Sequence, residues 1–309
     1  MKLSLSEAIT RARTAGAARF NAKPGDNRIR SGSIYCELFP KFSLPPGATV
    51  FTMGSCFARS VEEKLPGFEL PTMAIAVPKT ERLGRPNGIL NEYNPGTMCQ
   101  RIEVSARKES FSSSCLVEEK GGYLDLLLPE YTSPVSLERV LARRAEVDAV
   151  YSRLFDSEAI FITLDTIECW YDTGSQLYLN RIPPPAILHA ERDRYELRIL
   201  EVLDTRSLLF KMAQVLLGRG VSRIILTVSP VPLEVTYSGK DCQVANCYSK
   251  SVLIASAQEL SNSYSQIDYF PGYEIAASYG SALFEGDGVH VRDDIVEEIT
   301  TYMVKRYVG

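Results

Sequence analysis

The sequence predicts an α/β protein whose mostly parallel central sheet is covered by helices on both faces, as a three-layer α/β/α sandwich. Short apolar runs alternate with helical periodicity along most of the chain, which is typical of right-handed strand–helix–strand units. Residues 159–164 are continuously apolar, as expected of a central parallel strand. Unusual polar residues directly follow several of these runs, where parallel sheets place their functional groups.

The elements follow from the spacing of apolar residues and from the positions of Gly and Pro. The predicted strands cover residues 48–53, 68–77, 159–164, 223–228 and 267–270. The predicted helices cover residues 3–18, 56–65, 96–106, 136–154, 195–217, 249–261 and 293–307. The positions expected on the buried side of the fourth helix are Leu137, Val140, Leu141, Val147, Val150 and Leu154.

Three segments lack a clear period. Residues 86–95 are dense in turn formers and are expected to form a loop. Gly121-Gly122 separates two short apolar runs, so residues 109–135 are expected to hold a hairpin or an irregular insertion. Residues 174–194 are interpreted as a loop or a small hairpin. We therefore place one domain with an insertion over residues 48–309.

Residues 1–47 are interpreted as an N-terminal helix followed by an extended arm. The arm is rich in Gly, Pro and Asn, and we expect it to pack on the domain as a brace. Contact with a partner, or with a second copy in a homo-oligomer, is the alternative.

Composition narrows the class of protein. The 309 residues suffice for one large α/β domain, and the formal net charge of −4 without a long basic stripe excludes nucleic acid as a main partner. The seven scattered cysteines predict reduced thiols in a cytoplasmic protein rather than a disulfide framework. No apolar run is long enough to span a membrane, and the N-terminus lacks the apolar core of a secretory signal.

Ser55 lies at an abrupt turn between a strand and a helix. A β-branched and aromatic run ends at Gly54-Ser55, and Phe57, Val61 and Leu65 then recur with helical spacing. A serine in this position has its hydroxyl at the open end of the sheet and its backbone N–H at a helix N-terminus. The first property suits a nucleophile, and the second suits stabilisation of an oxyanion.

His290 is the candidate base for Ser55. Only two histidines are present, His189 and His290, which excludes a multi-histidine metal site. Asp287 stands three residues before His290 in a Gly-rich turn, so the two side chains can hydrogen-bond. Asp287 would hold the imidazole tautomer, and His290 would take the proton from Ser55.

These motifs resemble those of the GSCFA family, which looks like a branch of the SGNH/GDSL hydrolases. Gly54-Ser55-Cys56-Phe57-Ala58 spells the name motif of the family. The further segments that resemble family motifs, in the same order, are residues 87–95, 163–170, 227–231, 249–253, 269–274 and 287–290. The resemblance implies a flavodoxin-like sandwich, an SGNH-type serine hydrolase and a triad of Ser55, Asp287 and His290.

One departure from the family pattern affects the oxyanion site. SGNH enzymes place a Gly-x-Asn-Asp turn after the central strand, and its Asn donates to the oxyanion. Here residues 165–168 read Asp-Thr-Ile-Glu, so the Asn is missing and an acidic Asp165 replaces the glycine of the GSCFA motif. The oxyanion hole would then rest on the Ser55 N–H and on a donor from the loop between Gly88 and Asn94.

Other polar and aromatic residues have two interpretations each. Glu168 and Trp170 would line the substrate site, with Trp170 stacking on a sugar ring, or Trp170 would pack in the core. Lys250 would neutralise an anionic substrate or cap a buried carboxylate. Cys56 would be a nucleophile paired with His290, although packing as a small apolar group is the preferred interpretation.

The expected function is a serine esterase that acts on an O-acyl ester, commonly an O-acetyl ester, of a carbohydrate. An acyl-serine intermediate would form on Ser55 and be hydrolysed by water. A glycan hydroxyl in place of water would make the enzyme an O-acyltransferase, and a bacterial polysaccharide pathway suits either reaction. No metal or cofactor is expected, and acyl-CoA would be a co-substrate only of the transferase.

A binding or scaffold module is the alternative from another class. The missing Asn and the acidic Asp165 are consistent with a vestigial triad. In that case the domain would bind a glycan without turning it over.

Overall fold

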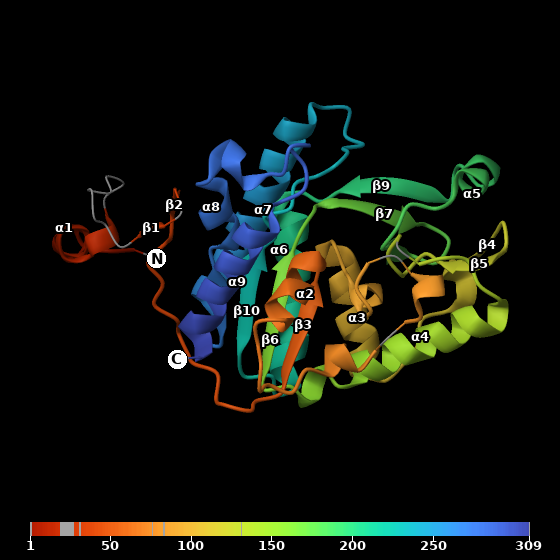
Figure 1. Cartoon of the computed structure of the whole chain (residues 1–309), viewed down its shortest axis with the longest axis horizontal. Coiled ribbons are helices and arrows are strands. Elements are labelled where there is room, and N and C mark those ends of the chain that lie inside the picture. The colour runs from red at the N-terminus through yellow and green to blue at the C-terminus, as the bar shows by residue number, and fades with distance from the viewer. Residues whose placement is uncertain are drawn as a thin grey trace.

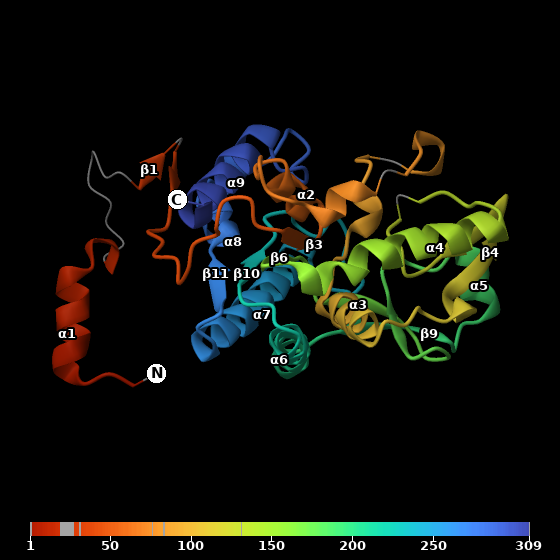
Figure 2. The ribbon, with the colours of Figure 1, turned by 90° about the horizontal axis from the view of Figure 1, so that it is seen from below.

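The computed structural model describes residues 2–18, 28–30, 32–75, 77–82, 84–130 and 132–308. At the centre of this part of the chain is a four-stranded parallel sheet in the order β11-β10-β6-β3 (Figures 1 and 2). Its strands are β3 (Val50–Gly54), β6 (Ala159–Leu164), β10 (Ile224–Val228) and β11 (Ile267–Phe270). The predicted α/β class with a parallel central sheet is confirmed.

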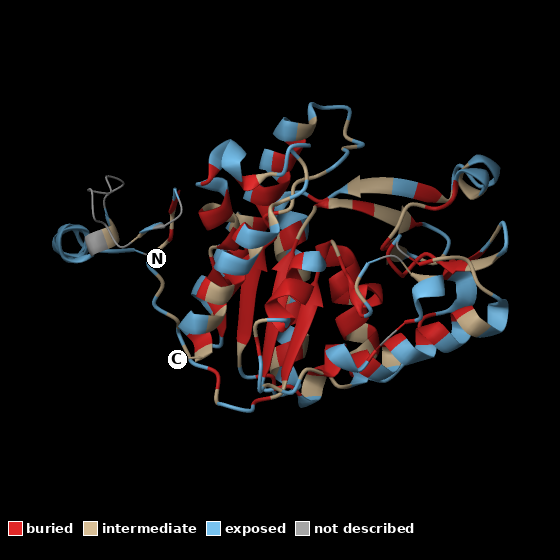
Figure 3. Ribbon diagram, viewed as in Figure 1, coloured by how far each residue is buried: buried red, intermediate tan, exposed pale blue. Residues whose placement is uncertain are grey.

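Helices cover both faces of this sheet because successive strand side chains point to opposite sides. Phe51, Ile160 and Leu226 belong to one core cluster, whereas Phe161 and Ile225 belong to the other. The helices of the first cluster are α3 (Pro95–Arg107), α4 (Leu137–Ser152), α6 (Val202–Gly218) and α7 (Cys242–Ser263). Those of the second are α2 (Cys56–Glu62), α8 (Gly272–Ala277) and α9 (Asp293–Val308). Figure 3 shows the buried strands between these two helical layers.

An antiparallel insertion extends from the carboxyl end of β6. Strand β7 (Glu168–Asp172) follows β6 after a short turn and pairs with both β8 (Leu177–Leu179) and β9 (Tyr195–Ile199). The hairpin of β4 (Leu116–Glu119) and β5 (Gly122–Asp125) and the short helix α5 (Pro185–Ala190) complete this lobe. Figure 1 shows it projecting sideways from the top of the sheet. Residues of β7 and β8 line the site described below.

The later part of the N-terminal segment packs against the domain. Helix α1 (Leu5–Thr14) begins with a capping box at Ser4 but buries no residue, and Figure 2 shows it apart from the domain. The short strands β1 (Ile29–Arg30) and β2 (Ser33–Ile34) pair with each other. Further on, the Leu44 N–H donates to the Tyr307 carbonyl at 2.7 Å, so this stretch packs against α9. Residues 20–27 and 31 of the expected arm lie outside the described residues.

The strand predicted over residues 68–77 is wrong. Among the described residues of this segment, only Glu69 forms a bridge, opposite Thr49 just before β3, and its carbonyl accepts from the Val50 N–H at 2.8 Å. Pro71 then begins a 3₁₀ turn (Pro71–Ala74), because proline has no N–H to extend the ladder. Ala76 lies outside the described residues.

Two other expectations are corrected. Residues 195–199, predicted as the start of a helix, form β9, and their polar–apolar alternation fits a strand. On α4, Leu137 and Leu141 were expected to be buried but are 46% and 44% exposed. The buried side of this helix instead includes Arg143 and Arg144, whose charges are paired with carboxylates of Glu81 and Asp125.

Within the described ranges, no helix combines the length and apolar character needed to cross a bilayer.

Candidate active site

The turn after β3 requires glycine at position 54. Gly54 has a φ of +141°, and a Cβ there would lie 2.4 Å from the Thr163 carbonyl oxygen on the neighbouring strand β6. The close approach places Ser55 at the N-cap of α2, where it is 1% exposed. Its hydroxyl does not cap the helix and instead lies 3.4 Å from the Ser229 hydroxyl, at the end of β10.

Asp287 and His290 form a hydrogen-bonded pair in the turn before α9. Oδ1 of Asp287 accepts from the backbone N–H groups of Val289 at 2.9 Å and His290 at 3.0 Å. Its Oδ2 lies 2.6 Å from Nδ1 of His290. Since a carboxylate only accepts, Nδ1 carries the proton and Nε2 is left as the basic nitrogen.

The same contacts shift both pKa values. The backbone N–H of Val289 and the His290 ring lower the pKa of Asp287 to about 2, so its carboxylate is ionised at neutral pH. In turn, the hydrogen bond and the charge of Asp287 raise the pKa of His290 above its ordinary 6.5. The His290 side chain is 78% exposed, so solvent reaches the ring freely.

Ser55 and His290 line one cavity of about 390 Å³. They come from segments far apart in the sequence, since Ser55 follows β3 and His290 lies in the turn before α9. Among the described residues, the hydrogen bond of the Ser55 hydroxyl is to Ser229 and none joins it to His290. The structure therefore brings the predicted nucleophile and base to the same cavity, with the serine proton directed elsewhere.

Lys250 caps the carboxylate of Asp165. Its Nζ lies 3.0 Å from Oδ1 of Asp165 and 2.8 Å from the carbonyl oxygen of the same residue. The Lys250 side chain is 1% exposed, whereas that of Asp165 is 18% exposed. Of the two interpretations of Lys250, this geometry matches the carboxylate cap, and the ammonium group balances the acidic charge of Asp165.

Gly88 and Asn94 occupy different places. The Gly88 N–H donates to the Arg85 carbonyl at 3.0 Å, and Gly88 lines the neighbouring cavity rather than that of Ser55. Asn94 lines the Ser55 cavity and caps α3, with its Oδ1 accepting from the Thr97 N–H at 2.9 Å. Of these two predicted residues, Asn94 is therefore the one that lines the Ser55 cavity.

Glu168 and Trp170 contact the loop that contains Thr236 and Tyr237, beside the cavity. The Glu168 carboxylate accepts from the Thr236 hydroxyl at 2.5 Å and from the Tyr237 N–H at 2.9 Å. The ring of Trp170 meets the Tyr237 ring edge-on at 5.2 Å. Trp170 thus lines the cavity, and it also packs against the apolar cluster of the insertion lobe, outside the two clusters of the central sheet.

Several residues that line the cavity or contact Ser55 were missed as candidates from the sequence. Ser229 had the signal of a polar residue directly after a strand, but its contact with Ser55 depends on the strand order. Asn180 and Arg181 follow β8 and carried no signal. The guanidinium of Arg181 reaches the Thr132 carbonyl and hydroxyl at 3.3 Å, and burial lowers the pKa of Arg181.

A second cavity of about 440 Å³ adjoins the first. It lies between α2, the turn around Gly88 and the beginning of α9. Cys56 and His290 line both cavities. The pKa of the Cys56 thiol is raised by desolvation and by Asp165, which disfavours the thiolate that a cysteine nucleophile needs.

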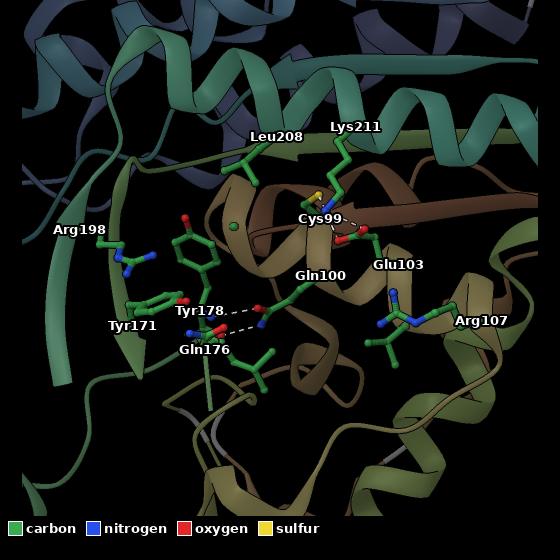
Figure 4. Close-up of a pocket in the computed structure, with 13 residues that line it drawn as sticks. Cys99, Gln100, Glu103, Arg107, Tyr171, Gln176, Tyr178, Arg198, Leu208 and Lys211 are labelled. Carbon is green, nitrogen blue, oxygen red and sulfur yellow. Dashed lines mark hydrogen bonds and ion pairs between the residues drawn. The ribbon is translucent and has the colours of Figure 1, made fainter. Parts of the chain in front are cut away.

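A third cavity, of about 330 Å³, lies between α3, α6 and the insertion (Figure 4). Several of its polar groups are paired with one another: Lys211 with Glu103 at 2.8 Å, and Gln100 with the backbone of Tyr178 at 2.6 and 2.9 Å. No residue that lines it also lines the Ser55 cavity. None of the predicted site residues lies here.

Comparisons with known proteins identify the family. No curated protein matches the chain. A matching solved structure is the N-terminal part of a Bacteroides fragilis protein containing a phosphatase domain, complexed with Mg; it shares 12% identity at a TM-score of 0.36. The match covers 84% of this chain and 51% of that one, so the chain spans about half of its length. The model of the GSCFA family matches residues 49–302. The chain therefore belongs to the GSCFA family.

Proposed function

We propose that the protein is a serine esterase that hydrolyses an O-acyl ester of a carbohydrate. The supporting observation is that Ser55 shares a cavity with His290, whose imidazole is oriented by Asp287 at 2.6 Å. A nucleophile, a base and a group that orients the base are the parts of the Ser-His-Asp mechanism. In this respect the site is similar to those of SGNH-type hydrolases.

The reaction begins when the Ser55 hydroxyl turns from Ser229 toward Nε2 of His290. His290 takes the hydroxyl proton while the oxygen attacks the carbonyl carbon of the ester. The tetrahedral intermediate collapses, the C–O bond to the sugar breaks, and His290 gives the proton to the departing alcohol. Water then repeats the sequence on the acyl-serine and releases the acid, and Asp287 stabilises the imidazolium in both halves.

The oxyanion is stabilised by the backbone N–H of Ser55 and by Nδ2 of Asn94. Asn94 is held by its cap on α3, so its amide is positioned before substrate arrives. Lys250 offsets the Asp165 charge that would otherwise oppose a negative oxygen nearby. Asn94 thus takes the role that an Asn after the central strand has in SGNH enzymes.

The composition of the cavity wall supports a carbohydrate as the ligand. Trp170 and Tyr237 provide aromatic surface, and Glu130 and Arg181 provide hydrogen-bonding groups. Aromatic rings with a few polar groups are typical of sites that bind small polar ligands with apolar faces. A glycan hydroxyl could also replace water at the acyl-serine, and the same residues would then catalyse acyl transfer.

One observation favours a second candidate, a glycan-binding module without turnover. Ser55 is 1% exposed, and its hydroxyl bonds to Ser229 rather than to His290. A serine fixed in that way would bind no acyl group.

A fluorophosphonate probe separates the two candidates. Labelling of the wild type that disappears in Ser55→Ala supports the esterase, and Ser152→Ala, a change of an exposed serine on α4, is the matched control. His290→Gln should abolish labelling as well, whereas His189→Gln should not. Absence of labelling in folded wild-type protein would favour the binding module.

A further inference from the structure

Two cavities meet at the reactive centre. Cys56, Val231 and His290 line both of them, whereas Ser55 lines only the one that also contains Trp170. An ester carbonyl held at Ser55 would therefore lie beside the junction of two separate spaces.

The second cavity has a mainly apolar wall. Phe57, Val231, Val291 and Val296 contribute side chains to it. The Arg59 guanidinium, which also borders it, is paired with Glu62 at 2.6 Å and donates to the Thr52 carbonyl at 2.9 Å. The Asn91 amide and the Asp293 carboxylate also border the cavity, but most of the exposed wall is apolar, so the space suits a ligand with an apolar chain.

A second cationic neighbour is paired in the same way. Arg85 donates to the Cys56 carbonyl at 3.0 Å and forms an ion pair with Glu63 at 3.1 Å. Neither guanidinium group is therefore an unpaired cation that would select an anionic ligand.

We propose that this second cavity binds the acyl chain of the substrate, and that the chain is much longer than acetyl. The inference rests on the proposed esterase function. The two sides of an ester diverge at the carbonyl carbon, and the cavity with Trp170 and Arg181 fits the sugar side. The acyl side then extends past His290 and Cys56 into the apolar space. An acetyl methyl would leave most of its 440 Å³ unfilled.

Chain length provides the test. Hydrolysis of p-nitrophenyl acetate, butyrate and octanoate by the wild type should rise in kcat/KM by about fourfold per added methylene, the factor expected for burying one CH₂ group. Val296→Phe narrows only the second cavity, so it should remove this rise while acetate hydrolysis stays within about twofold. Val304→Phe, at another half-buried valine of α9 that lines none of the three cavities described, is the matched control. A wild-type optimum at acetate, or an equal loss at all lengths in Val296→Phe, would overturn the inference.

A binding measurement separates this inference from the reaction. Octanoate is titrated into Ser55→Ala by calorimetry, with and without Val296→Phe. Binding that Val296→Phe weakens at least tenfold supports the acyl cavity even in a protein that no fluorophosphonate labels, and only the esterase proposal would then be withdrawn. Absent binding, or binding that Val296→Phe leaves unchanged, overturns the acyl cavity whether or not Ser55 reacts.

Discussion

The ammonium group of Lys250 lies 3.0 Å from the carboxylate of Asp165, at the end of β6 and next to the Ser55 cavity. The two partners differ in burial, since the lysine side chain is 1% exposed and the aspartate side chain 18%. Because of this difference, removing one charge should affect the stability of the protein more than removing the other.

Asp165→Asn should destabilise the protein more than Lys250→Met. The first change leaves a fully buried ammonium without a counter-charge, which costs about 3 kcal/mol in buried pairs. The second leaves a carboxylate that water can still reach. Urea unfolding of both variants and of the double variant measures this order, and a larger loss in Lys250→Met would contradict it.

Asn94→Asp should separate the structural and the chemical role of Asn94. The carboxylate still accepts from the Thr97 N–H, so α3 keeps its cap and the melting temperature should change little. The Nδ2 donor is lost, which predicts a fall in kcat of about 10²- to 10³-fold if it stabilises the oxyanion. A kcat within tenfold of the wild type would assign the oxyanion donor elsewhere.

The rate of ester hydrolysis should fall as the pH is lowered, and the midpoint of this acid limb should lie above pH 6.5. Asp287 raises the pKa of His290 from 6.5, and only the neutral imidazole can accept the Ser55 proton. Activity is therefore present above that raised pKa and lost as the pH falls through it. Asp287→Asn removes the stabilising charge, so the acid limb of kcat/KM should move to lower pH while the maximal rate drops. A limb that stays in place would assign it to another group.

Gly54→Ala should lower the free energy of unfolding by about 3 kcal/mol. The φ of +141° strains any residue with a side chain, and the new Cβ would clash with the Thr163 carbonyl oxygen. Gly218→Ala, at the end of α6 with no atom within 4 Å of the added Cβ, serves as the control and should stay within about 1 kcal/mol. Thermal unfolding of the two variants gives the comparison.

Local signals accounted for the parts of the site that sequence could predict. The turn at Gly54-Ser55 and the pair of Asp287 and His290 each lie within a few residues, so their geometry follows from short-range bonding. The parallel sheet was also predictable, because continuous apolar runs such as 159–164 mark strands buried on both faces.

Long-range pairing accounts for what the sequence could not provide. Residues 195–199 form a strand because β7 is available beside them, not because of their own propensity alone. Arg143 and Arg144 are buried because Glu81 and Asp125, far away in sequence, carry the opposite charge. The contact of Ser55 with Ser229 likewise depends on which strands end at the same edge.

The order of synthesis gives the placement of Ser55 and His290 a further meaning. Ser55 follows the first strand of the sheet, whereas His290 precedes the final helix α9. Under the proposed chemistry, a nascent polypeptide on the ribosome carries its nucleophile long before its base emerges. A chain whose synthesis has not reached His290 therefore cannot hydrolyse an ester by this mechanism. Proteolytic cleavage just upstream of α9 would likewise inactivate the folded protein.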